Sequence, residues 1–244
     1  QTGIKKNKAG HDLNYLAESG LLSLSTYKDG TPILPNTQIA DIAAGSYPAF
    51  MNIILALIKS QRTNQGSYLD ISMYENLVPL AWLGLTYALN GKKIKKNSLH
   101  LNGGLARYNI YETKDKKYIA LGALEDKFWK KFCNIINAPK EVVLEKTSNE
   151  LIIKKIKKIT KKENESFWKK KFSKETNVCC TAVNDIKSFI NDPHIVKKNI
   201  FKNNIILDEK KIALIPTPIE KTLIKIKNNN KAPKLGQNNS LLKK

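Results

Sequence analysis

The sequence predicts an α/β protein in two parts, and three observations carry that expectation. Its 244 residues are 41% hydrophobic, which is enough to bury a core and allows one large domain or two small ones. Before residue 102, segments with helical spacing of apolar residues surround a short strand-like segment. After residue 125 the composition shifts to short lysine-rich amphipathic helices. We therefore expect domains over residues 1–101 and 102–205, then a returning segment and tail over residues 206–244.

The first part is expected to contain two helices, a strand and a third helix, in that order. Leucines at helical spacing predict a short helix over residues 12–24, with Asp12 placed to cap it. The small and apolar residues 42–58 predict a buried helix with a bend near Pro48, because proline removes one helical hydrogen bond. Residues 66–73 predict a strand, and residues 74–89 predict a helix that ends at Asn90 and Gly91.

The second part is expected to begin with a hairpin and continue with helices. Gly103 and Gly104 indicate a turn, and residues 108–111 and 117–121 predict two strands joined around Asp115. Residues 149–161 predict an amphipathic helix whose apolar face comprises Leu151, Ile152, Ile156 and Ile159.

The net charge of +21 would by itself suggest an anionic partner such as nucleic acid. The lysines are scattered along nearly every segment, however, and arginine occurs only at Arg62 and Arg107. Proteins that read nucleic acids favour arginine for bidentate base contacts and interleave aromatic residues for stacking. We therefore expect no nucleic-acid partner, and a lysine-rich binding module remains an alternative to an enzyme.

Membrane and export signals are weak in this sequence. The longest apolar stretch, residues 51–58 with Asn52 inside it, is far shorter than the ~20 residues that span a bilayer. No charged region followed by an apolar region stands near Gln1, and the final Leu-Leu-Lys-Lys is not a peroxisomal tripeptide. Cys133, Cys179 and Cys180 are spaced like neither a metal site nor a disulfide framework. The expectation is a cytoplasmic protein without a membrane partner.

Three short segments supply the groups of a proton-transfer site. The segment Gly10-His11-Asp12-Leu13-Asn14-Tyr15 provides an imidazole, and Asp41 and Glu125 provide two carboxylates in small-residue, apolar surroundings. From the residues alone, a structural or surface role for His11 is the commoner alternative.

The amino-acid sequence of these segments resembles that of the α-methylacyl-CoA racemases of the family III (CaiB/BaiF) CoA-transferase superfamily. The resemblance extends from Gln1 to Gln237 and includes the segment Asp192-Pro193-His194. It implies the CoA-transferase family III fold: part of a Rossmann-like large CoA-binding domain with a smaller α+β domain. The first nucleotide-binding units, about the N-terminal third of a family member, would lie before Gln1.

The resemblance also implies a reaction, the interconversion of (R)- and (S)-2-methylacyl-CoA through an enolate. His11 and Asp41 match the two opposing bases of the family, and Glu125 matches the glutamate that orients the histidine. The family implies no metal and no redox cofactor, an acyl-CoA substrate and an interlocked homodimer. The residues expected to contact the thioester and its pantetheine arm are Gly10, Asp12, Leu13, Asn14 and Tyr15.

The CoA-transferases of the same superfamily provide an alternative reaction. They use an aspartate at the position of Asp12 as a nucleophile that forms an acyl-enzyme anhydride. The residue before that aspartate is typically not histidine in those relatives, so the order Gly10-His11-Asp12 favours the racemase. His100 and His194 are expected to be loop residues without a catalytic role.

Overall fold

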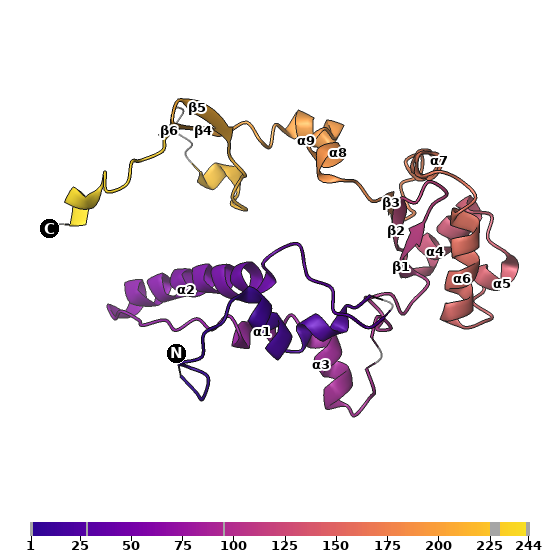
Figure 1. The fold of residues 1–244 in the computed structure, drawn as a ribbon, viewed down its shortest axis with the longest axis horizontal. Coiled ribbons are helices and arrows are strands. Elements are labelled where there is room, and N and C mark those ends of the chain that lie inside the picture. Colours follow the sequence, from indigo (N-terminus) through magenta and orange to yellow (C-terminus); the bar gives the residue numbers. More distant parts are fainter. Residues whose placement is uncertain (1, 28, 95, 225–229, 243–244) are drawn as a thin grey trace. The chain divides into compact units, whose positions relative to one another are not determined.

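The computed structural model describes residues 2–27, 29–94, 96–224 and 230–242, and its contacts divide the chain into two units, Gln1–Val183 and Asn184–Lys244 (Figure 1). Both helices and strands are present, which agrees with the α/β expectation. The first unit contains two separate hydrophobic cores, one formed by residues before 78 and one by residues after 105. The expected domain boundaries at residues 101 and 205 stay predictions.

The N-terminal part of the first unit is built from short helices around a small core. Its elements are α1 (Asp12–Glu18), η1 (Leu21–Leu24), η2 (Ala40–Ser46), α2 (Tyr47–Thr63), η3 (Glu75–Leu77) and α3 (Trp82–Leu89). The core comprises Leu16, Ala40, Ala44 and Leu77, all at most 1% exposed. The helix expected over residues 12–24 is split in two, because Gly20 adopts a φ of 80° that an α-helix cannot continue through.

The π-helical segment η2 continues directly into α2, and Pro48 lies at the junction. A proline at position 48 has no N–H to donate to the carbonyl oxygen of Ala44, four residues earlier. That oxygen instead accepts a hydrogen bond of 2.9 Å from the side-chain amide of Asn76. Since Ala44 is fully buried, the amide of Asn76 satisfies an acceptor that water does not reach.

Replacing Asn76 with alanine is therefore expected to destabilise the first unit. The substitution leaves the Ala44 oxygen without a donor, which costs about 1–3 kcal/mol of unfolding free energy. Asn52→Ala is the matched control, since Asn52 makes the same kind of bond to the Pro48 oxygen at an exposed position. Urea unfolding followed by circular dichroism should show a clear loss for Asn76→Ala only. Equal losses for the two variants would contradict this role.

The helix predicted over residues 42–58 exists, but its predicted burial is wrong. No residue of α2 is buried, and large apolar side chains such as Phe50, Met51 and Leu55 are more than half exposed. Among the described residues, Ala40–Thr63 is the one helix long and apolar enough to cross a membrane, judged by length and composition alone. The sequence argument counted an apolar stretch of residues 51–58 only, and it left out the alanines and glycine before residue 51 that make the helix long and apolar enough.

Two further predictions in this part are wrong. Residues 66–73 form no strand, because no described strand pairs with them, and Tyr68 is 94% exposed. The helix predicted over residues 74–89 is interrupted between η3 and α3, where Pro79 lies. Its end is as expected: Asn90 is the C-cap of α3 and Gly91 has a φ of 67°.

A turn with a close backbone approach leads to the second core. Gly103 has a φ of 106°, and a Cβ atom at Gly104 would lie 2.0 Å from the carbonyl oxygen of Ser98. Any side chain at position 104 would therefore force the loop open. Asn97 ties this loop to Thr26, whose N–H donates to the Asn97 side-chain oxygen at 3.0 Å.

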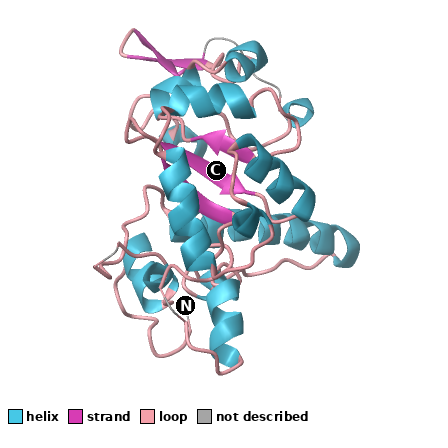
Figure 2. Cartoon of the chain, turned by 90° about the vertical axis from the view of Figure 1, so that its right-hand side faces the viewer, coloured by secondary structure: helices cyan, strands magenta, loops and turns pink. Residues whose placement is uncertain are grey.

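The second core includes buried residues of the antiparallel sheet β1–β2–β3, and the predicted hairpin is confirmed. The elements are β1 (Tyr108–Glu112), β2 (Tyr118–Gly122), α4 (Asp126–Ile135), α5 (Lys140–Val143), α6 (Asn149–Thr160), α7 (Glu165–Phe172) and β3 (Cys180–Ala182). In register, Tyr108 faces Gly122 and Glu112 faces Tyr118. Helices α6 and α7 contact the strands (Figure 1). Figure 2 draws the strands in magenta and the helices in cyan.

Helix α6 lies where the sequence predicts it, with Ile152 and Ile156 buried; Leu151, expected on the same face, is 48% exposed. Cys133 and Cys180 pack in this core as free thiols, and burial raises the pKa of Cys133 to about 12. Cys179 is exposed instead.

The second unit is smaller. Its elements are α8 (Ile186–Ile190), α9 (Pro193–Lys198), β4 (Asn204–Leu207), β5 (Lys210–Ala213), η4 (Lys221–Leu223), β6 (Asn230–Lys231) and η5 (Asn239–Leu242). Strand β4 pairs antiparallel with β5 and parallel with β6. Asp192 caps α9 by accepting the N–H of His194 at 2.8 Å, so Asp192 has a structural role here.

Candidate active site

His11 stands at the start of helix α1, with its imidazole exposed. It is the N-cap residue, and its backbone N–H donates to the side-chain oxygen of Asn14 at 3.0 Å. This contact closes the first turn and satisfies a backbone donor that the helix leaves free. Asn14, predicted to contact substrate, thus also shapes the backbone that carries His11.

Gly10 and Tyr15 fix the approach to His11 from the other side. The Tyr15 hydroxyl donates to the carbonyl oxygen of Gly10 at 3.1 Å. A Cβ atom at Gly10 would lie 3.1 Å from the Tyr15 ring, closer than side-chain atoms normally pack. The absence of a side chain at position 10 therefore lets the ring cover the backbone just before the histidine. Leu13, in the same turn, is exposed.

The carboxylate of Asp12 joins this segment to the one that carries Asp41. One of its oxygens accepts the backbone N–H of Ala40 at 2.5 Å and that of Asp41 at 3.1 Å. The expectation that Asp12 caps its own helix is wrong: His11 is the N-cap of α1, and Asp12 binds the first amides of η2. A carboxylate suits that position because the N-terminal end of a helix carries partial positive charge.

Asp41 lies in the first turn of η2, and its side chain is exposed. The π-helical geometry of η2 is uncommon, and such segments occur frequently at functional sites. The hydroxyl of Ser46 donates to the backbone oxygen of Asp41 at 2.9 Å, which supports the wide turn. Helices α1 and η2 are in contact, so the segment that carries His11 lies next to the segment that carries Asp41.

An ion-pair cluster holds the segment before His11 against α1. Lys5 lies 2.7 Å from the carboxylate of Glu18, and Lys8 pairs with the other oxygen. Hydrogen bonds from Lys5 and then Lys8 hold the pKa of Glu18 at about 2, below its usual 4.5. A lowered carboxyl pKa favours the paired state above pH 4.5, and that preference is lost as the pH falls through about 2.

Glu125 lies beside the second core of the unit, at the start of α4. It is the exposed N-cap residue of α4, and its backbone oxygen accepts the N–H groups of Phe128 and Trp129, each at 3.0 Å. Within the described ranges, its carboxylate forms no hydrogen bond or ion pair, so no such contact joins it to His11 or Asp41.

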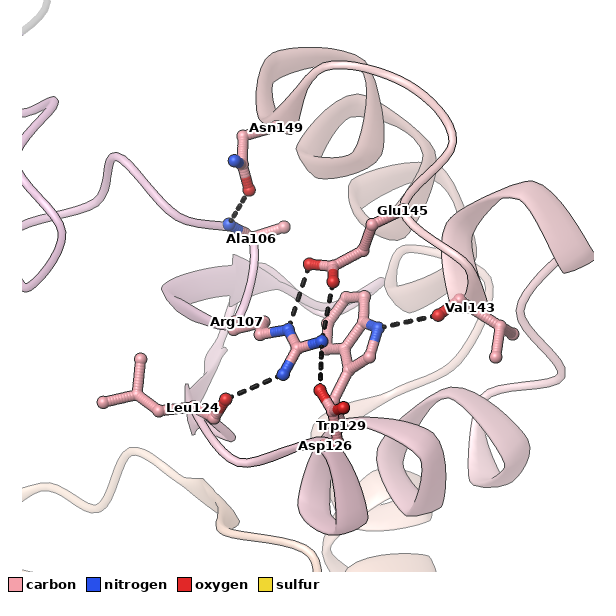
Figure 3. Close-up of polar contacts among 8 residues, drawn as sticks. All are labelled: Ala106, Arg107, Leu124, Asp126, Trp129, Val143, Glu145 and Asn149. Atoms are coloured by element: carbon pink, nitrogen blue, oxygen red, sulfur yellow. Dashed lines mark hydrogen bonds and ion pairs between the residues drawn. The ribbon is translucent and has the colours of Figure 1, made fainter.

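Sequence reasoning missed Arg107, which contacts both chain neighbours of Glu125. The Arg107 guanidinium donates to the Leu124 carbonyl at 2.7 Å and pairs with Asp126 at 2.7 Å, so it binds both neighbours of Glu125 (Figure 3). Its hydrogen bonds lower the pKa of Asp126. Scarcity was the available signal: in a chain with 42 cationic residues, arginine occurs twice.

Comparisons with known proteins agree on one family. The model of CoA-transferase family III matches residues 1–239. The human alpha-methylacyl-CoA racemase is 27% identical over 223 residues, which cover 90% of this chain and 57% of the racemase. The human succinyl-CoA:glutarate CoA-transferase is 25% identical in an alignment of 246 positions that covers 97% of this chain and 55% of the transferase. The chain thus spans little more than half the length of these relatives.

Among solved structures, Rv3272 from Mycobacterium tuberculosis superimposes with a TM-score of 0.79 at 18% identity, over 98% of this chain and 65% of that one. A second match is a CaiB/BaiF family protein from Brucella suis, with a TM-score of 0.70 at 19% identity, over 99% of this chain and 64% of that one. Likenesses at such low identity concern the fold, and they agree with the expected fold class.

Proposed function

Because the chain belongs to CoA-transferase family III, we propose that it acts on acyl-CoA thioesters and interconverts (R)- and (S)-2-methylacyl-CoA. The observation that carries the proposal is the pair of hydrogen bonds from Ala40 and Asp41 to the Asp12 carboxylate. These bonds hold the residue after His11 against the backbone of Asp41. An imidazole and a carboxylate are thereby carried on adjoining helix ends.

In the proposed reaction, one base removes the α-proton and the other group returns a proton to the opposite face. His11 or Asp41 accepts the proton, according to the enantiomer bound, and an enolate of the thioester forms. Each pKa unit between the carbon acid and the base costs about 1.36 kcal/mol, so the two groups must be well placed. Glu125 is proposed to orient the imidazole, as carboxylates commonly do. The reaction consumes no metal and no redox cofactor.

A CoA-transferase is the second candidate, favoured by the likeness to the succinyl-CoA:glutarate enzyme over 97% of the chain. In that reaction the carboxylate of Asp12 attacks the thioester carbonyl, CoA leaves as a thiolate, and an acyl anhydride remains on the enzyme. The two backbone hydrogen bonds to one Asp12 oxygen weigh against it, since they stabilise the carboxylate and so lower its reactivity as a nucleophile.

Incubation of the protein with a 2-methylacyl-CoA and a free carboxylic acid in deuterated water separates the two reactions. The racemase proposal predicts deuterium at the α-carbon and formation of the other epimer, with no CoA on the free acid. Asp12→Asn sharpens the test, because an amide oxygen still accepts the two N–H groups but cannot form an anhydride. Deuterium incorporation should survive that substitution. CoA transfer without incorporation, abolished by Asp12→Asn, would refute the racemase.

We also propose that a second copy of the chain, rather than a bilayer, covers the exposed face of α2. The segment Ala40–Ser46 is built into the first core, and Asp12 binds its N-terminal amides. The 17 residues of α2 itself extend about 25 Å, short of the ~30 Å hydrocarbon layer. A contiguous exposed apolar surface of this kind is typical of a protein interface. This supports the homodimer implied by the family.

A further inference from the structure

One guanidinium contacts the two residues that flank Glu125: the backbone of Leu124 and the side chain of Asp126. The Nη1 atom of Arg107 donates to the carbonyl oxygen of Leu124, which immediately precedes Glu125. The Nη2 atom lies 2.7 Å from a carboxylate oxygen of Asp126, which immediately follows it. Figure 3 shows both contacts leaving the same planar group. The position of the Glu125 backbone therefore depends on where this guanidinium lies.

The guanidinium is itself fixed by a third partner and by an aromatic ring. Its Nε and Nη2 atoms donate to the two oxygens of Glu145, at 3.0 and 2.6 Å, in the bidentate geometry that arginine and carboxylates favour. It also lies 5.4 Å from the centre of the buried Trp129 ring. The Arg107 side chain is 15% exposed, while the carboxylates of Glu145 and Asp126 that it binds are 34% and 72% exposed.

The backbone around Arg107 is anchored as firmly as its side chain. Its carbonyl oxygen accepts the N–H of Ala123 at 2.8 Å, and the N–H of Ala106 donates to the Asn149 side chain at 2.9 Å. These bonds connect the arginine to the end of β2 and to the start of α6. A lysine at position 107 would keep the charge but would lack the planar set of donors that reaches three partners at once.

We propose that Arg107 is a positioning residue: by holding Leu124 and Asp126 it fixes the carboxylate of Glu125 for its part in proton transfer. This inference rests on the proposed racemase function, in which Glu125 orients the catalytic histidine. Arg107 acts through the peptide backbone and does not touch the reacting atoms.

The first test compares two carboxylates with matched surroundings. Asp126 is 72% exposed, pairs with Arg107 at 2.7 Å and lies in the first turn of α4. Glu150 is 77% exposed, pairs with Lys154 at 2.8 Å and lies in the first turn of α6. We expect Asp126→Asn to lower kcat for deuterium incorporation about tenfold with KM unchanged. Glu150→Gln should change neither, while both variants unfold at similar temperatures.

The second test measures the backbone itself and needs no activity. In Arg107→Lys, hydrogen exchange of a peptide covering residues 122–130 should accelerate about tenfold, and exchange in α6 beyond its first turn should not. Unchanged exchange in residues 122–130 would overturn the inference whatever the activity. Faster exchange with an unchanged kcat would also overturn it and leave the racemase proposal standing. A wild-type protein without deuterium incorporation would refute the racemase, and Arg107 would then hold this segment for another purpose.

Discussion

Replacement of His11 by alanine is expected to slow racemisation in both directions by about 10²- to 10⁴-fold, the usual contribution of a positioned general base. The imidazole is exposed, and the His11 backbone closes the first turn of α1: its N–H donates to the Asn14 side chain and its carbonyl oxygen accepts the Asn14 N–H. The substitution should therefore leave the unfolding temperature unchanged, so that lost activity reports chemistry. Chiral chromatography of a 2-methylacyl-CoA after incubation with each variant measures the rate.

Exchange of the α-proton should separate the two enantiomers in that variant. The enantiomer whose proton faces Asp41 can still lose it and regain deuterium from the same side, so exchange without inversion is expected to persist. The enantiomer that faces position 11 should exchange no faster than in buffer. Asp41→Asn should show the opposite pattern. His194→Ala, at another exposed histidine, serves as the control. A His11→Ala variant as fast as the wild type would remove the imidazole from the mechanism.

Elements with strong local signals could be predicted from the sequence, and elements decided by distant contacts could not. The hairpin around Asp115 and helix α6 follow from residue patterns that lie within single segments. The exposure of α2 could not be predicted in this way, because a mostly apolar helix has the same sequence pattern whether it faces a core or a partner. The strand predicted over residues 66–73 failed because strand formation requires a neighbour, which no periodicity reveals.

The candidate site shows the same division. Motif and resemblance single out His11, Asp12 and Asp41, but the contact from Asp12 to Asp41 joins residues 29 positions apart and emerges from folding. Arg107 and Glu145, which form a hydrogen bond, are separated by an even larger distance along the sequence, 38 positions. Conversely, the resemblance assigns Glu125 a role that no contact in the described ranges connects to His11.

The largest loss of stability is expected for Trp129→Ala, at the centre of the second core. Trp129 is fully buried and stacks on Phe132 with ring centres 6.0 Å apart. Its indole N–H donates to the Val143 carbonyl oxygen at 3.1 Å, and its ring supports the Arg107 guanidinium. Truncation leaves a cavity and an unpaired acceptor, which together cost about 3–5 kcal/mol of unfolding free energy.

Trp82→Ala provides the control, because this substitution removes the same atoms from a tryptophan side chain that is 56% exposed. Thermal unfolding followed by circular dichroism should show a fall on the order of 10 °C for Trp129→Ala and a few degrees at most for Trp82→Ala. Since the Trp129 ring lies beneath the guanidinium, Trp129→Ala should also accelerate hydrogen exchange in residues 122–130 at temperatures where the protein remains folded. Similar unfolding temperatures for the two tryptophan variants would show that the core around β1–β3 does not depend on this ring.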